Sequence, residues 1–77
     1  MTVHSPLPVA GYKAQSSETV ELVNGNKRVE EAALRILDAL AQDPTIDQRW
    51  LAIGRTHLEQ AWMAINRSIF QPRRIDL

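Results

Sequence analysis

The chain has 77 residues and no cysteine, and its nine basic and nine acidic side chains give a formal net charge of zero. A chain of this length forms one small domain whose core alone stabilises it weakly, so self-association often supplies the rest. The lack of cysteine excludes disulfides and thiolate metal sites and favours a reducing cytoplasm, and the balanced charge argues against binding to duplex nucleic acid.

Residues 1–15 are expected to form an extended N-terminal arm. The segment contains Pro6 and Pro8 and shows no helical periodicity. It lacks the basic start and the continuous apolar core of a secretory signal, and no segment of the chain approaches the roughly 20 apolar residues of a membrane span. We therefore expect a cytoplasmic protein with no membrane contact.

A first helix is expected to begin near Ser16, because a hydroxyl suited to N-capping precedes acidic residues that the helix dipole favours. Pro44 predicts its end, since proline disfavours helical backbone in the preceding residue. Between these limits, apolar or small side chains recur at steps of four and three and so share one stripe, in which Asn26 is the single polar member. The stripe comprises Leu22, Asn26, Val29, Ala33, Ile36 and Leu40.

A second helix is expected to start at residues 45–48, whose sequence Thr-Ile-Asp-Gln has the form of a capping box, and to stop before Pro72. The short connection makes the two helices antiparallel neighbours. The sequence therefore predicts an all-α fold: an antiparallel two-helix hairpin over residues 16–72, preceded by the arm and followed by a short tail over 73–77. One seam of the second helix alternates large and small residues: Leu51, Gly54, Leu58, Ala61, Ile65 and Ser68.

Two helices in contact leave much of each surface in water, and further apolar side chains fall outside the seams. A large exposed apolar surface marks an interface, which in a chain of this kind is most simply made with another copy. We therefore predict a helical homo-oligomer whose interface includes Trp62, Ile65, Ile69 and Phe70.

Tyr12, in a Gly-Tyr-Lys turn before the first helix, and Lys27, placed near the start of that helix, are the candidate binding residues. An aromatic face together with an ammonium group near unpaired helix amides suits a flat, phosphate-bearing small molecule. Each residue also has a purely structural interpretation, since Tyr12 can pack the arm on the hairpin and Lys27 can be a surface cation. The role of Arg55 is equally open, because Arg55 can be either a phosphate ligand or the ion-pair partner of Glu59.

Catalysis and metal binding have little support in the sequence. The histidines are His4, in the arm, and His57, which has no second histidine at ligand spacing. We expect no catalytic residue, no metal site and no cofactor.

Several segments in a fixed order resemble the phage anti-CBASS cyclic-nucleotide sponges, a family that shares its hairpin domain with one group of phage anti-Thoeris sponges. The likeness runs from residue 11 to residue 72. The segments are Gly11-Tyr12-Lys13, Val23-Asn24 with Lys27, Asp38-Ala39-Leu40, Trp50-Leu51-Ala52-Ile53-Gly54-Arg55-Thr56 and Asn66-Arg67-Ser68-Ile69-Phe70-Gln71-Pro72.

The resemblance implies a hexamer, a trimer of dimers, that captures cyclic dinucleotides in the host bacterial cytoplasm and starves the CBASS effector of its signal. It implies that Tyr12 stacks on a base and that Lys27 meets a phosphate. Some members also hold cyclic trinucleotides, at positions that correspond here to Lys13, Val29 and Arg67. The wider set of possible ligand contacts is Gly11, Lys13, Asn24, Arg55, Thr56 and Arg67.

Two positions depart from the family pattern. Asn26 stands where an apolar residue is usual, and Val29 lacks a hydroxyl, which leaves trinucleotide binding open. An alternative of another class is a small helical interaction module, a phage adaptor or regulator, whose Trp50 and Trp62 contact a host protein. A phosphodiesterase ranks third, because the chain lacks the metal ligands and acid–base groups that such an enzyme needs.

Overall fold

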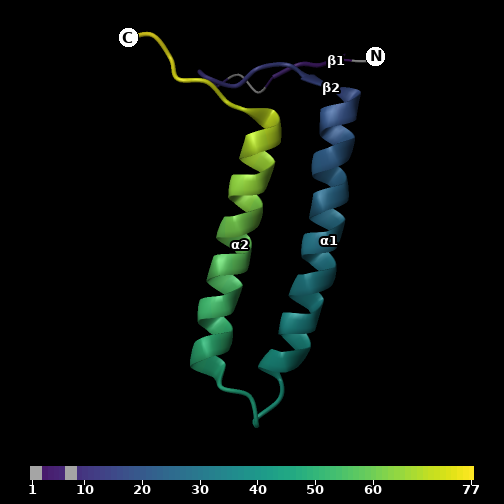
Figure 1. Cartoon of the computed structure of the whole chain (residues 1–77), viewed down its shortest axis with the longest axis vertical. Coiled ribbons are helices and arrows are strands. Elements are labelled where there is room, and N and C mark those ends of the chain that lie inside the picture. Colours follow the sequence, from purple (N-terminus) through teal and green to yellow (C-terminus); the bar gives the residue numbers. More distant parts are fainter. Residues whose placement is uncertain (1–2, 7–8) are drawn as a thin grey trace.

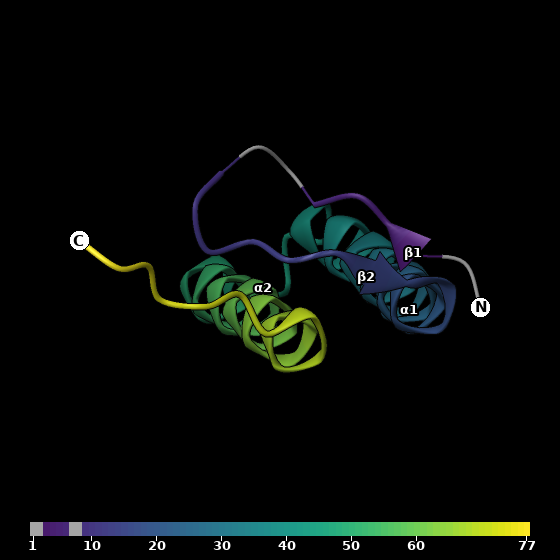
Figure 2. The ribbon, with the colours of Figure 1, turned by 90° about the horizontal axis from the view of Figure 1, so that it is seen from above.

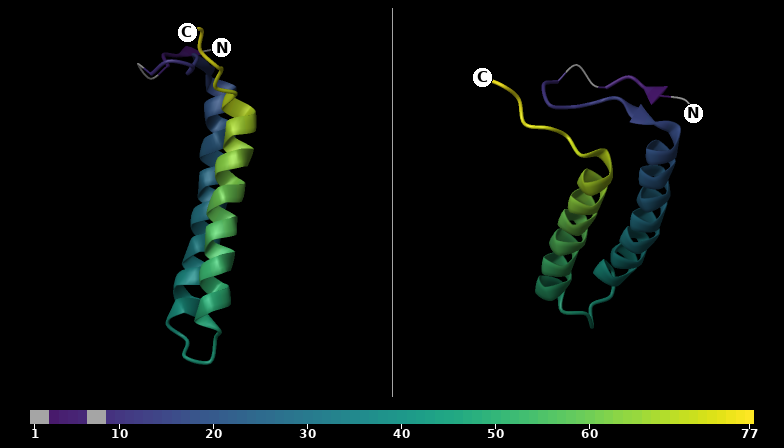
Figure 3. Two further views of the ribbon diagram at one scale, coloured as in Figure 1. Left: turned by 90° about the vertical axis from the view of Figure 1, so that its left-hand side faces the viewer. Right: turned by 45° about the horizontal axis from the view of Figure 1, so that its top comes forward.

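Two antiparallel helices make up most of the computed structural model, which describes residues 3–6 and 9–77 (Figure 1). They are α1 (Ser17–Ala41) and α2 (Gln48–Phe70), joined by residues 42–47 at the end of the hairpin away from both chain termini. The chain measures 49 × 32 × 17 Å, and an edge-on view shows the helices as a single layer (Figure 3). The predicted antiparallel hairpin is confirmed.

A short pair of strands joins the arm to the start of α1 and is an addition to the all-α prediction. Strands β1 (Val3–His4) and β2 (Gln15–Ser16) are antiparallel, with Val3 opposite Ser16. The segment that leads into β2 passes across the ends of the two helices (Figure 2). Residues 1–2 and 7–8 of the expected arm lie outside the described residues.

The helix limits follow from local capping chemistry. Ser16 is the N-cap of α1, and its hydroxyl accepts a hydrogen bond of 3.2 Å from the backbone N–H of Thr19, which satisfies an otherwise unpaired donor. Gln71 ends α2 in the left-handed conformation, and its N–H donates to the carbonyl of Arg67 at 2.7 Å. The expected start of α1 and the expected stop at Pro72 are therefore confirmed.

The predicted capping box at residues 45–48 is wrong, because Asp47 is the N-cap of α2 and accepts from the N–H of Trp50 at 3.1 Å. Thr45 instead donates its hydroxyl, at 2.7 Å, and its N–H, at 2.9 Å, to the carboxylate of Asp43. These hydrogen bonds hold the pKa of Asp43 below its usual value, with the hydroxyl bond the larger cause. Gln48 donates to the carbonyl of Leu40 and so closes the turn.

The hairpin buries little of its apolar surface. Among the described residues, Val23 is the one buried hydrophobic residue, at 4 % exposure. The stripe predicted on the first helix is divided, since Asn26, Ala33 and Leu40 are half-buried. The remaining members are exposed and are called here the outer stripe: Leu22 at 59 %, Val29 at 58 % and Ile36 at 63 %.

The division of the stripe has a geometric cause. A single neighbouring helix covers one side of an apolar face that is wider than the contact between two rods.

No helix within residues 3–6 and 9–77 combines the length and the apolarity that a membrane span requires.

Candidate ligand-binding site

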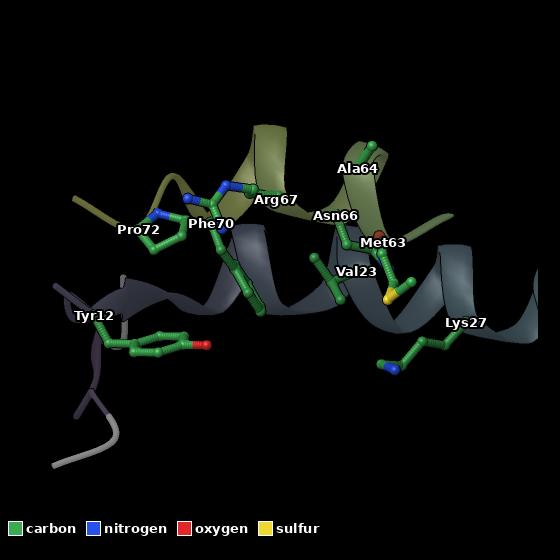
Figure 4. Close-up of a pocket in the computed structure, with 9 residues that line it drawn as sticks. All are labelled: Tyr12, Val23, Lys27, Met63, Ala64, Asn66, Arg67, Phe70 and Pro72. Atoms are coloured by element: carbon green, nitrogen blue, oxygen red, sulfur yellow. The ribbon is translucent and has the colours of Figure 1, made fainter. Parts of the chain in front are cut away.

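An open hollow of about 470 Å³ lies between the arm, α1 and the C-terminal half of α2 (Figure 4). Its volume falls within the range of about 300–1,000 Å³ that is usual for small-molecule sites. It is lined by Tyr12, Val23, Lys27, Met63, Ala64, Asn66, Arg67, Phe70 and Pro72.

Tyr12 is presented to the hollow by a tight turn. Its N–H donates to the carbonyl of Val9 at 3.2 Å, and the preceding Gly11 has a φ of 92°, a conformation that glycine adopts without strain. The side chain of Tyr12 is 49 % exposed, and its hydroxyl end points along the hollow toward Lys27 (Figure 4). An aromatic face in this position is open to a stacking partner.

Lys27 reaches the hollow from α1, one helical turn after Val23. The predicted placement of Lys27 near a helix start is wrong, because Lys27 lies ten residues, roughly 15 Å, beyond Ser17, whereas the dipole acts within the first turn. Lys27 is exposed and makes no ion pair with any side chain in the described ranges. Its ammonium is therefore available to an anionic ligand.

The opposite wall of the hollow comes from one face of α2 and from the first residues of the tail. Met63, Asn66, Arg67 and Phe70 recur at helical spacing and so face the same side. Phe70, which was predicted at the oligomer interface, lines the hollow together with Pro72, and its ring extends from the end of α2 into the hollow (Figure 4). Arg67 is the member of the wider predicted set that joins Tyr12 and Lys27 here.

The other predicted contacts do not line this hollow within one chain. Arg55 bonds to Asp38 across the hairpin at 2.7 Å, rather than to Glu59. Thr56 donates its hydroxyl to the carbonyl of Ala52 at 3.1 Å. The remaining positions that do not line the hollow are Gly11, Lys13, Asn24 and Val29, of which Val29 belongs to the outer stripe.

An amide pair crosses the hairpin beside the hollow. The side-chain nitrogen of Asn26 donates to the side-chain oxygen of Asn66 at 3.1 Å, and both residues are half-buried. The polar residue that interrupts the apolar stripe of α1 is thus paired, and the pair fixes one register of the two helices. Asn66 also lines the hollow, so the pair holds part of its wall.

Because Asn66 accepts a hydrogen bond from Asn26 across the hairpin, Asn66→Ala is expected to lower the free energy of unfolding by about 0.5–1.5 kcal/mol, the usual net contribution of one hydrogen bond. Replacing both residues, as Asn26→Leu with Asn66→Leu, is expected to restore most of this loss. Urea unfolding followed by circular dichroism measures both. A double variant no more stable than Asn66→Ala would contradict the pairing.

The chemistry of the hollow is that of a binding site: an aromatic ring, an ammonium, a guanidinium and an apolar wall. No cluster of three or more His, Cys, Asp or Glu that could hold a metal ion occurs in the part of the chain that the structure describes. His57 is exposed on α2, and the ring nitrogen of His4 lies 3.4 Å from the hydroxyl of Ser17. The sequence had indicated Tyr12, Lys27 and Arg67, but not Val23, Met63, Ala64, Asn66, Phe70 and Pro72 as lining residues.

The fold and the hollow define a small helical-hairpin protein with a candidate ligand-binding site. Residues 6–70 match the Acb2/Tad1 hairpin domain, and the chain belongs to this family of anti-CBASS and anti-Thoeris sponges. The family sequesters ligands rather than transforming them, which implies a sponge-type role against host defence. The suspected family is thus confirmed. Comparisons with curated proteins and with solved structures returned no match.

Proposed function

We propose that the chain is a non-catalytic sponge that binds cyclic dinucleotides and so blocks CBASS defence against phage. The observation that supports this most directly is the convergence of Tyr12 and Lys27, from the arm and from α1, on one hollow (Figure 4). The ring can stack on a base, and the ammonium can meet the adjoining phosphate. Arg67 in the same wall offers a second cation.

The binding free energy expected from one hollow is too small for tight binding, which indicates that two copies of the hollow share one ligand. Stacking contributes about 1–3 kcal/mol per base, and a charge-assisted hydrogen bond about 1.5–3 kcal/mol. One hollow therefore supplies about 2.5–6 kcal/mol, whereas nanomolar binding needs about 12 kcal/mol. A cyclic dinucleotide has approximate two-fold symmetry, so a two-fold dimer can present Tyr12 and Lys27 to each half.

The outer stripe supports self-association. Leu22, Val29 and Ile36 are exposed at steps of seven residues along α1, which places them on a single line that suits a facing helix. We propose that a second copy covers this line within the hexamer that the family resemblance implies. Trp62, Ile65, Ile69 and Phe70 stay predicted as further interface residues, and of these Ile65 is 44 % exposed.

An interaction module remains the second candidate because Trp50 is 63 % exposed near the connection of the hairpin. Trp62 is half-buried. A discrete hexamer in sedimentation without ligand would favour the sponge, whereas a monomer that aggregates would favour the module.

A thermal-shift panel of cyclic di- and trinucleotides tests the proposal. A ligand at a hundred times its dissociation constant is expected to stabilise the protein by about 2.7 kcal/mol. Ligand recovered after heat release is expected to be chemically intact. Linear products would identify an enzyme instead, and a panel without any shift would contradict the sponge. The same panel decides whether trinucleotides bind.

A further inference from the structure

The tail beyond the matched hairpin domain returns to the binding site. The family match ends at residue 70, and the left-handed backbone of Gln71, with a φ of 48°, turns the chain there. Pro72 then lines the hollow, and the N–H of Arg73 donates to the carbonyl of Gly11 at 2.6 Å. The C-terminal tail is thereby bonded to the residue that precedes Tyr12.

A second hydrogen bond fixes the other side of the Tyr12 loop. The side-chain nitrogen of Gln15 donates to the carbonyl of Phe70 at 2.9 Å. Tyr12 lies between Gly11 and Gln15, so both ends of its loop are bonded to the C-terminal end of α2 or to the tail. Phe70 itself lines the hollow on the wall that Tyr12 faces. The hydrogen bond from Gln15 therefore links the position of the Tyr12 ring to that wall.

Gly11 shows that the tail and the loop are closely fitted. A Cβ atom at this position would collide with the carbonyl oxygen of Arg73, and the φ of 92° would in addition strain any L side chain. The backbone of the tail therefore occupies the space that the missing side chain leaves. The contact depends on backbone atoms of Arg73 and not on its guanidinium.

We propose that residues 71–73, called here the strap, are a positioning element of the nucleotide site: they hold the Tyr12 loop so that the ring stands ready to stack. This inference rests on the proposed function. A loop that is already ordered in the free protein loses less conformational entropy when the ligand binds. Preorganisation of this kind raises affinity without adding a ligand contact. Neither Gln71 nor Arg73 needs to touch the ligand.

The test removes one backbone donor in the full chain. Arg73→Pro deletes the N–H and leaves α2 intact, whereas Arg73→Ala deletes the charge and keeps the N–H. With 3′,3′-cyclic GMP–AMP as the probe in calorimetry, Arg73→Pro is expected to raise Kd about tenfold, or about 1.4 kcal/mol. Arg73→Ala and the control Arg74→Pro are expected to stay within about twofold. An unchanged Kd in Arg73→Pro, or an equal loss in Arg73→Ala, would overturn the strap.

A measurement without ligand separates this inference from the proposed function. Tyr12 is the only tyrosine of the chain, so tyrosine labelled with carbon-13 gives one set of ring signals. Arg73→Pro is expected to move these signals toward their positions in an unstructured peptide, whereas Arg73→Ala is expected to leave them in place. If the wild type binds no nucleotide, the proposed function is refuted, but the ring signals still test whether the strap positions Tyr12. Signals unmoved by Arg73→Pro would refute it.

Discussion

Replacing Tyr12 with alanine is expected to weaken binding of a cyclic dinucleotide by at least about 30-fold while the oligomer stays intact. A two-fold site loses two stacking contacts of about 1–3 kcal/mol each, which together weaken binding by roughly 30- to 10⁴-fold. Tyr12 is half exposed and belongs to the arm, so its removal leaves the packing of α1 against α2 unchanged. Calorimetry measures the affinity, and light scattering measures the assembly.

Matched variants separate stacking from charge. Tyr12→Phe keeps the ring and is expected to bind nearly as tightly as the wild type. Lys27→Ala is expected to weaken binding by at least about 100-fold, since each of the two lost charge-assisted hydrogen bonds costs about 1.5–3 kcal/mol. Arg28→Ala removes an exposed cation that adjoins Lys27 in sequence but does not line the hollow, and is the control. Full affinity in both Tyr12→Ala and Lys27→Ala would refute the site.

Most of the fold could be predicted because its signals are local. Ser16 carries a capping hydroxyl directly before α1, and Pro44 and Pro72 disfavour helical geometry in the residues before them. Each signal acts within a few residues of the helix end that it determines. The antiparallel arrangement then follows from the short connection.

The parts that could not be predicted depend on choices between equivalent groups or on distant contacts. Thr45 and Asp47 can both cap a helix, and the choice was made by Asp43, which binds the hydroxyl and the N–H of Thr45 and leaves Asp47 as the cap. The pairing of Val3 with Ser16 joins two strands of two residues each, too short for any periodic signal. In both cases the local sequence does not select one arrangement.

Only the part of the candidate site that the arm and α1 contribute was predicted, together with Arg67 of α2. Tyr12 and Lys27 stood out because an aromatic ring and a cation suit a nucleotide, and the family resemblance strengthened both. Asn66 and Phe70 were missed because the apolar spacing of α2 is compatible with several kinds of contact. The hydrogen bond from Gln15 to Phe70 places the arm over that face, and such a contact between residues 55 positions apart leaves no local pattern.

Introducing a charge into the outer stripe is expected to separate the subunits and to weaken ligand binding together. Val29→Glu places a carboxylate at the centre of the line formed by Leu22, Val29 and Ile36, where burial of each side chain contributes about 1.5–3 kcal/mol. A buried, unpaired carboxylate adds a further penalty, so smaller species are expected in sedimentation. Val29 does not line the hollow of one chain, so a loss of affinity for a cyclic dinucleotide is expected to act through assembly.

The control for this variant is Gln60→Glu, which adds the same charge at an exposed polar position of α2 and is expected to change neither size nor affinity. If Val29→Glu keeps the size of the wild type, the interface lies elsewhere, and Ile65→Glu then tests the surface predicted on α2. A separated Val29→Glu that still binds tightly would contradict the shared two-fold site. One hollow supplies at most about half of the free energy that nanomolar binding needs, so assembly and affinity must fall together if two copies close around one ligand.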